Sequence, residues 1–116
     1  MTIKTLTFSA TPEGRAFFRL LWLGFILGTT AKEAKSKDQI RKEARVLRPL
    51  RAISVPTTHD AALRELRKEG GTTQYEPADL ELLDQALQRV PWGGGDTLDV
   101  ADLFDFLSRA PESEKA

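Results

Sequence analysis

Three arginines at helical spacing are the side chains best suited to binding chemistry in this sequence. Arg41, Arg45 and Arg48 stand at positions i, i+4 and i+7, which places them on one face of a helix. Each guanidinium can donate a pair of hydrogen bonds to a carboxylate or a phosphate. Three interpretations follow: the arginines lie against acidic parts of their own chain or in solvent, they bind an acidic protein, or they bind nucleic acid.

Trp92 is the second candidate for binding. It stands between Pro91 and the glycines at 93–95, where local contacts alone bury a large ring poorly. Tryptophan is enriched among the residues that dominate binding energy at interfaces. In the competing interpretation, the ring folds back over the end of the preceding helix, at Leu87 and Val90. The predicted partner-binding residues are Arg41, Arg45, Arg48 and Trp92.

The sequence offers little for catalysis. His59 is the only histidine, and its neighbours Thr57, Thr58 and Asp60 are typical of a turn or cap, so we expect an exposed residue at a helix start. No serine lies in a nucleophile-elbow sequence. A pair of carboxylates brought together by folding stays open, because distances between carboxylates cannot be read from a sequence. We therefore expect a protein that is not an enzyme.

The sequence also predicts no metal site and no cofactor. The chain has no cysteine, which excludes thiolate ligands. Asp96, Asp99, Asp102 and Asp105 recur at every third residue, but that step drifts around a helix of about 3.6 residues per turn. These acids form a slanted ribbon and lack the pattern of a calcium-binding loop.

Charge is neutral overall but unevenly distributed. Residues 32–51 hold eight basic and three acidic side chains, whereas residues 76–116 hold ten acidic and three basic ones. A net charge of zero gives no overall field that would draw the chain to nucleic acid or to a membrane. Any contact with nucleic acid is therefore expected in the basic segment Lys32–Arg51.

One apolar run raises the question of a membrane or a leader. Residues 20–28 are nine uncharged residues, far fewer than the roughly 20 that span a bilayer. A signal peptide cleaved near Thr29–Ala31 is the alternative, but the preceding 19 residues are long for a leader and begin with a strand-like pattern. The absence of cysteine gives no sign of an oxidising compartment. We expect a cytoplasmic protein without membrane contact.

The first predicted helix begins at Thr11, a good N-cap, and runs from Pro12 to Leu27. Gly28 is expected to end it in a left-handed conformation. Nearly every position from Ala16 onward is apolar. Such a helix is buried on most sides or meets a partner chain, so it is either a central core helix or part of a contact with another copy.

The second predicted helix begins at Ser36, or earlier at Thr30, since each residue opens a possible capping box. It is expected to end or kink near Arg48, because Pro49 follows. Its expected apolar stripe consists of Ile40, Ala44 and Leu47.

The remaining segments complete the predicted architecture. Residues 3–8 alternate as a strand does, and 72–75 is the best partner strand. Residues 61–67 stay open between helix and strand. Leu80, Leu83, Leu87 and Val90 share one face of a helix that begins at Pro77. Asp96 or Thr97 caps a last helix whose core side holds Val100, Leu103, Phe104 and Leu107.

These elements predict a helix-rich α+β fold with about four helices and a small two- or three-stranded sheet. Residues 1–110 are expected to form a single compact domain, followed by a disordered polar tail at 111–116. The leading hypothesis for function is a small non-catalytic regulator that docks on a larger protein and changes its activity. The alternatives are a dimeric DNA-binding regulator that uses residues 32–51, and a structural protein that forms homo-oligomers.

Overall fold

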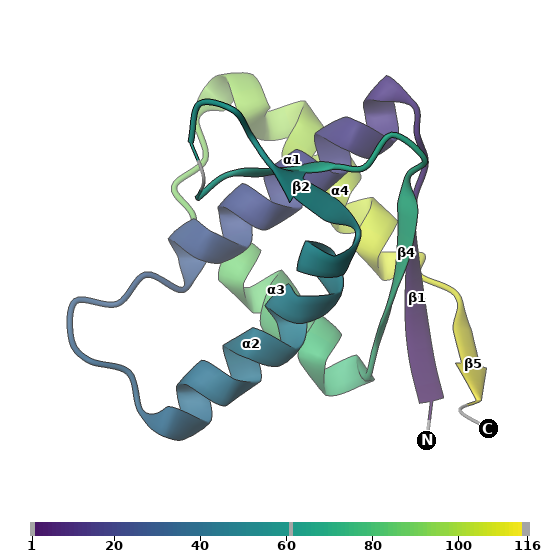
Figure 1. Cartoon of the computed structure of the whole chain (residues 1–116). Helices are drawn as coiled ribbons and strands as arrows, with labels where there is room; N and C mark the ends of the chain where they lie inside the picture. The colour runs from purple at the N-terminus through teal and green to yellow at the C-terminus, as the bar shows by residue number, and fades with distance from the viewer. Residues whose placement is uncertain (1, 61, 115–116) are drawn as a thin grey trace.

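The computed structural model describes residues 2–60 and 62–114. Within this part of the chain, four α-helices are accompanied by two small antiparallel sheets (Figure 1). The predicted helix-rich α+β fold is therefore confirmed, and the second sheet is an addition to it. No helix in the described ranges has both the length and the apolar character needed to cross a membrane.

The larger sheet has the strand order β4-β1-β5. β1 (Thr2–Phe8) pairs antiparallel with β4 (Gly71–Tyr75), from Lys4 opposite Tyr75 to Phe8 opposite Gly71. This confirms the predicted pairing of residues 3–8 with 72–75.

The opposite edge of β1 corrects the prediction for the C-terminal tail. The short strand β5 (Glu112–Glu114) pairs with Thr2–Lys4. The expected disorder at 111–116 is therefore wrong for β5, because its backbone satisfies hydrogen-bonding groups of β1 that would otherwise face solvent. Residues 115 and 116 lie outside the described residues.

The second sheet is a hairpin of β2 (Ser54–Pro56) and β3 (Arg64–Leu66). The segment 61–67, left open by the sequence, thus contributes a strand in its second half, while residue 61 lies outside the described residues. Leu66 is buried against the core, and this burial favours the strand over the helix that local propensity would also permit.

Helix α1 (Pro12–Gly28) begins as predicted, since the Thr11 hydroxyl accepts a hydrogen bond from the Gly14 amide at 3.2 Å. The expected left-handed stop at Gly28 is wrong. Gly28 is the last helical residue, and in the described chain only Gly70 has a positive φ, of 75°. Gly28 is needed instead for close packing, because a Cβ there would lie 1.9 Å from the carbonyl oxygen of Ala86.

Helix α2 (Lys37–Ala52) begins at the Ser36 cap but continues past Pro49, so the expected end near Arg48 is wrong. Proline removes one backbone donor from a helix. The last turn is held nevertheless, because Leu50 is buried and its carbonyl accepts a hydrogen bond from the Ser54 hydroxyl at 2.8 Å.

The buried face of α2 also differs from the expected stripe. Ile40 is 54% exposed, and the buried residues are Glu43, Val46 and Leu50. A carboxylate is accepted on this face because Lys35 pairs with Glu43 at 2.5 Å and the Gln39 amide donates to it at 2.7 Å. Sequence periodicity considers only apolar residues, so it does not predict that an acid paired in this way is buried.

The last two helices follow the prediction. α3 (Pro77–Gln88) buries Leu80, Leu83 and Leu87, and Val90 is buried just beyond it. A 3₁₀ turn, η1 (Gly94–Asp96), leads into α4 (Thr97–Ser108). The buried residues of α4 are Val100, Leu103 and Leu107, with Phe104 half-buried.

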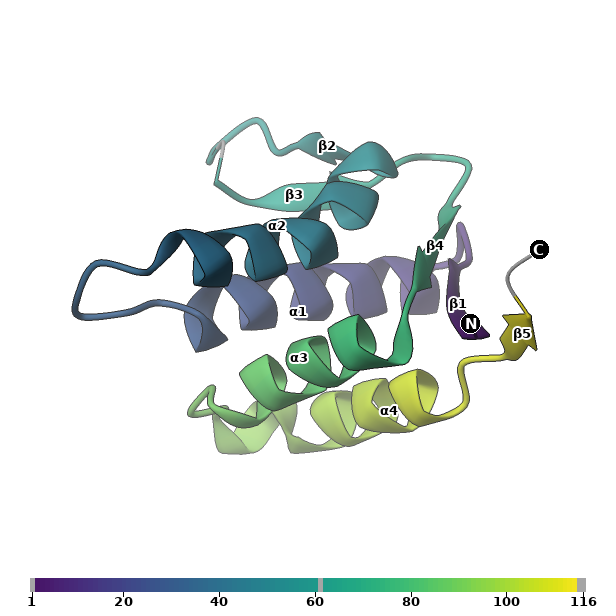
Figure 2. The ribbon, with the colours of Figure 1, turned by 90° about the horizontal axis from the view of Figure 1, so that it is seen from below.

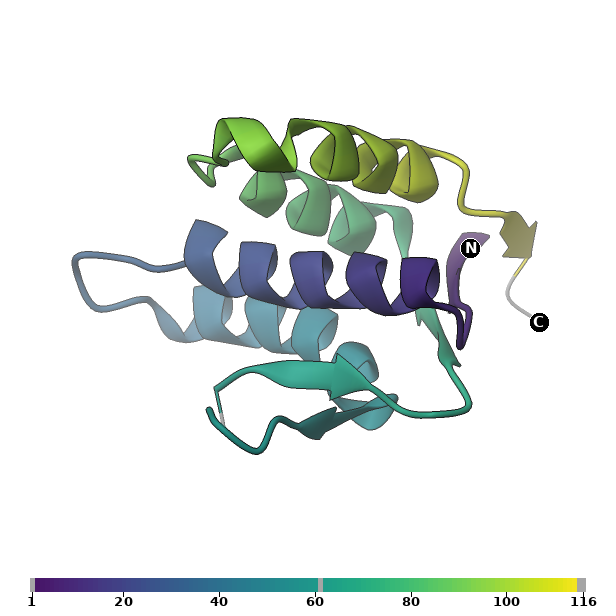
Figure 3. The same ribbon diagram turned by 90° about the horizontal axis from the view of Figure 1, so that it is seen from above.

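Helix α1 lies at the centre of the molecule (Figures 2 and 3). It has α3 and α4 on one side and the β2–β3 hairpin on the other, while α2 packs against α3. The larger sheet closes the end where α1 begins. There, Phe8 meets Phe18 edge-on with ring centroids 5.7 Å apart. The apolar run in the sequence is thus mainly a core helix.

Candidate functional site

The three predicted arginines project from the exposed side of α2. Arg41, Arg45 and Arg48 are all exposed, whereas Val46 and Leu50 on the opposite side are fully buried. The core residues fix the rotation of the helix about its axis, and this rotation directs the arginines into solvent. We call Arg41, Arg45 and Arg48 the arginine face.

Only one member of the arginine face is paired within the described residues. Arg45 Nε lies 3.5 Å from Asp79 Oδ1 of α3, and the Arg45 side chain is still 54% exposed. An exposed pair of this kind contributes about 0–1 kcal/mol. Arg41 and Arg48 have no ion pair with any residue in the described ranges. Two guanidinium groups are therefore available to a partner.

A cavity of about 430 Å³ adjoins the arginine face, between α2, β4 and the start of α3. Arg45 and Arg48 line one side of it, and Glu76 and Asp79 line the other. Its charge is therefore mixed. Tyr75 also lines it, and the Tyr75 hydroxyl donates to the carbonyl of Val46 at 2.7 Å.

Tyr75 is a structural residue of this cavity. Burial raises the pKa of its phenol well above the usual range, and the nearby Asp79 carboxylate acts in the same direction. The hydroxyl therefore stays protonated at neutral pH and cannot act there as a general base. Its hydrogen bond ties β4 to the middle of α2.

Trp92 lies away from the arginine face, on the pair formed by α1 and α3. Its ring is half-buried over Gly24, where a Cβ would lie 3.0 Å from two ring carbons. Its indole Nε1 donates to the Leu87 carbonyl at 2.9 Å. The ring thus folds back over the end of α3, as in the competing interpretation, and a contact between its exposed part and a partner stays a prediction.

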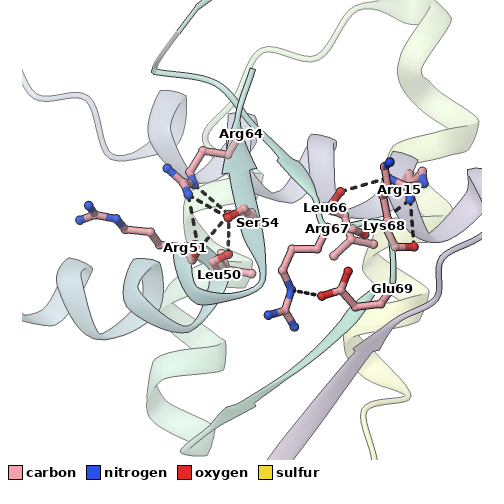
Figure 4. A network of polar contacts seen from close by, with 9 residues as sticks. All are labelled: Arg15, Leu50, Arg51, Ser54, Arg64, Leu66, Arg67, Lys68 and Glu69. Atoms are coloured by element: carbon pink, nitrogen blue, oxygen red, sulfur yellow. Dashed lines mark hydrogen bonds and ion pairs between the residues drawn. The ribbon is translucent and has the colours of Figure 1, made fainter. Parts of the chain in front are cut away.

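Two other arginines donate hydrogen bonds to groups of their own chain and so stabilise the fold (Figure 4). Arg15 donates to the carbonyls of Leu66 at 3.0 Å and Lys68 at 3.2 Å. Arg64 donates to the Ser54 hydroxyl at 2.8 Å and to the Ser54 carbonyl at 2.9 Å. Burial, reinforced by the charge of Arg51, lowers the pKa of Arg64. Arg15 fastens the β2–β3 hairpin to α1, whereas Arg64 joins β3 to β2 and reaches the Arg51 carbonyl of α2 at 3.5 Å. No spacing in the sequence predicted these roles.

His59 is exposed, but it lies in the turn between β2 and β3 and not at a helix start. It lines a cavity of about 350 Å³ together with Trp22, Leu23 and Leu63. No pattern in the sequence indicated this cavity, because it forms only when the hairpin folds over α1. The Trp22 indole Nε1 donates to the Ala62 carbonyl at 3.0 Å, which fixes the floor of the cavity.

Residues of the types that bind metal ions do not cluster in the described part of the chain. In the ranges 2–60 and 62–114, no three histidine or acidic side chains lie close enough to hold a metal ion. The acids of α4 are spread along its exposed side, with Asp99, Asp102 and Asp105 all exposed. No protein-family model, no curated protein and no solved structure matches this chain.

Proposed function

We propose that this protein is a non-catalytic, protein-binding regulator that docks through the arginine face on an acidic surface of a larger protein. The observation that carries the proposal is the contrast between two kinds of arginine. Arg15 and Arg64 are committed to backbone carbonyls of their own chain, whereas Arg41 and Arg48 are exposed and without an ion pair in the described chain. Exposed guanidinium groups steer an acidic partner and fix its orientation.

An apolar strip beside the arginines favours a protein partner. Ile40, Ala44 and Arg48 follow one another at intervals of four and form one row along α2. Ile40 is 54% exposed, and Ala44 is half-buried. Protein interfaces commonly combine exposed apolar side chains with arginine. A phosphate backbone gains nothing from the isoleucine.

The neighbouring acids argue in the same direction. Asp79 pairs with Arg45, and Glu76 lines the same cavity. Carboxylates beside the arginine face repel phosphates, whereas a protein partner can place its own basic side chain opposite them. In addition, residues 30–36 form no helix, so α2 lacks the closely preceding helix of a helix-turn-helix.

The homo-oligomer hypothesis finds less support from α1. Phe18, Leu21 and Phe25 are fully buried within the chain itself. Leu27 is the exposed large apolar residue of this helix, and one such residue is a small contact for a stable dimer.

The test is capture of a partner from lysate by the tagged protein, with and without nuclease. The test variant carries Arg41→Glu and Arg48→Glu. The matched control carries Arg19→Glu and Lys68→Glu, which make the same charge change at exposed positions outside α2. Circular dichroism verifies that both variants are folded.

We expect a stoichiometric protein band that survives nuclease, persists with the control and falls at least about tenfold with the test variant. Equal capture by the two variants would show that the arginine face is not the contact. Loss of the captured material on nuclease treatment would instead support the DNA-binding regulator.

A further inference from the structure

Part of one edge of β1 is free. The Thr5 amide donates to the Pro111 carbonyl at 3.0 Å, so the backbone of Thr5 faces the edge that β5 occupies. Because strands alternate, the N–H and C=O of Thr7 face this same edge. β5 ends its pairing at Lys4, and no hydrogen bond within the described chain reaches Thr7 from this side. The exposed Thr7 therefore presents one donor and one acceptor to any strand that comes alongside.

The free edge opens onto a cavity of about 500 Å³ between β1, the start of α1 and the end of α4. Phe17 and Phe106 line it, stacked with ring centroids 5.0 Å apart and an interplanar angle of 20°. Both rings are half-buried, so they provide an apolar floor. The cavity thus offers a ligand both hydrogen-bonding backbone groups and an apolar surface for a side chain.

Charge around the cavity is mainly negative. Glu13 of α1 and Asp102 and Asp105 of α4 line it, against the single cation Arg109. All four side chains are exposed. The acidic residues of α4 therefore lie beside the free part of the β1 edge. Only folding brings these two features together.

We propose that this cavity, which we call the β1 groove, binds an extended basic segment of a partner protein that adds a strand beside Thr7. Its backbone bonds to the N–H and C=O of Thr7. Alternate side chains of a strand point to opposite sides, so one side chain rests on Phe17 and Phe106 while lysines or arginines next to it reach the acids. Strand addition of this kind takes its affinity from main-chain bonds and its specificity from side-chain pockets.

The chain's own segments are poor occupants of the β1 groove. β5 runs antiparallel to β1 with Glu114 opposite Thr2, so the C-terminal segment leads away from Thr7. It is also acidic, and Asp102 and Asp105 repel it. The basic segment of a second copy is largely helical, as α2, and cannot supply an extended strand. A separate basic segment is the occupant that fits.

The probe for the test is a fluorescein-labelled seven-residue peptide of alternating lysine and valine. Its binding is measured by anisotropy at low salt and mapped by amide chemical shifts. A peptide of alternating glutamate and valine tests charge, and a lysine–valine peptide with N-methylated backbone amides tests strand pairing. The protein variant carries Asp102→Asn and Asp105→Asn. Its matched control carries Glu33→Gln and Asp99→Asn, exposed acids that do not line the groove.

We expect saturable binding of the lysine–valine peptide, with shifts centred on Thr5, Thr7 and Phe106. The groove variant should bind about fivefold more weakly, the control variant should bind as the unchanged protein does, and the glutamate and N-methylated peptides should not bind. Absence of saturable binding, shifts centred on another surface, or equal weakening in both variants would overturn the proposal. So would a concentration-dependent dimer with the same shifts and no peptide, because a second copy would then be the occupant.

Discussion

Gly28 of α1 lies directly against the backbone of Ala86 in α3: a Cβ at position 28 would be 1.9 Å from the Ala86 carbonyl oxygen. Gly24, one turn earlier, faces side chains instead: a Cβ there would lie 2.4 Å from Leu87 Cδ2 and 3.0 Å from two ring carbons of Trp92. Glycine, whose side chain is a single hydrogen atom, is needed at both positions so that α1 and α3 can approach closely. The central position of α1 depends on this approach.

The first prediction is that Gly28→Ala destabilises the fold. Alanine favours a helix over glycine by about 1 kcal/mol, but the new methyl group meets backbone that cannot rotate away. We expect a net loss of about 2 kcal/mol in the free energy of unfolding, measured by urea denaturation. Gly95→Ala is the control, because nothing lies within 4 Å of a Cβ there. Equal stability of the two variants would mean that α1 and α3 are not packed this closely.

The second prediction concerns Tyr75 and alkaline pH. Its folded-state pKa is raised above the ordinary 10.0, so above about pH 10 the folded chain holds a proton that the unfolded chain releases. Stability from this group is therefore complete below about pH 10 and decreases as pH rises beyond it.

Urea denaturation at about pH 8 and about pH 11 checks this prediction against Tyr75→Phe. At the lower pH, the variant should lose about 1 kcal/mol, because the hydrogen bond to the Val46 carbonyl is gone. The unchanged protein should lose more stability than the variant between the two pH values. Identical pH dependence in both proteins would place the Tyr75 hydroxyl in solvent.

Local signals in the sequence predicted several elements of the fold. The Thr11 cap, the 72–75 strand and the apolar face of α3 were all found in this way. Periodicity failed on α2, because Glu43 takes an inward position with Lys35 and Gln39 as partners that no spacing rule anticipates. Exposure of Ile40 followed from the same rotation of the helix.

Of the two candidate sites, one could be predicted from the sequence and the other could not. A shared face for Arg41, Arg45 and Arg48 follows from helical spacing alone, and all three are exposed. The β1 groove could not be predicted, because its lining joins β1 and the start of α1 to the end of α4, which is distant in the sequence. The free part of the β1 edge depends on where β5 ends, and no sequence pattern indicated that residues 112–114 would pair with β1.

The third prediction separates two roles of Trp92. Replacing it by alanine removes the bond to the Leu87 carbonyl and the ring that covers Gly24, so we expect a loss of about 2 kcal/mol in the free energy of unfolding. Trp92→Phe keeps an aromatic ring over Gly24 and should lose about half as much. Partner capture is then measured well below the unfolding temperature of each variant. Unchanged partner capture would mean that Trp92 contributes only to the fold. Weaker capture by both variants, with the fold intact, would mean that Trp92 contacts the partner.

The last prediction tests the apolar strip beside the arginine face. Ile40 is 54% exposed on α2, so Ile40→Ser removes little buried surface and should change the free energy of unfolding by less than about 0.5 kcal/mol. If a protein covers the strip, the same change should weaken capture several-fold, because an apolar side chain that becomes buried at an interface contributes about 1–2 kcal/mol. Leu98→Ser is the matched control: Leu98 is 79% exposed, on α4. Weaker capture with Ile40→Ser alone supports docking through α2. Equal partner capture by the two serine variants would mean that any contact at α2 depends on the arginines and not on the apolar strip.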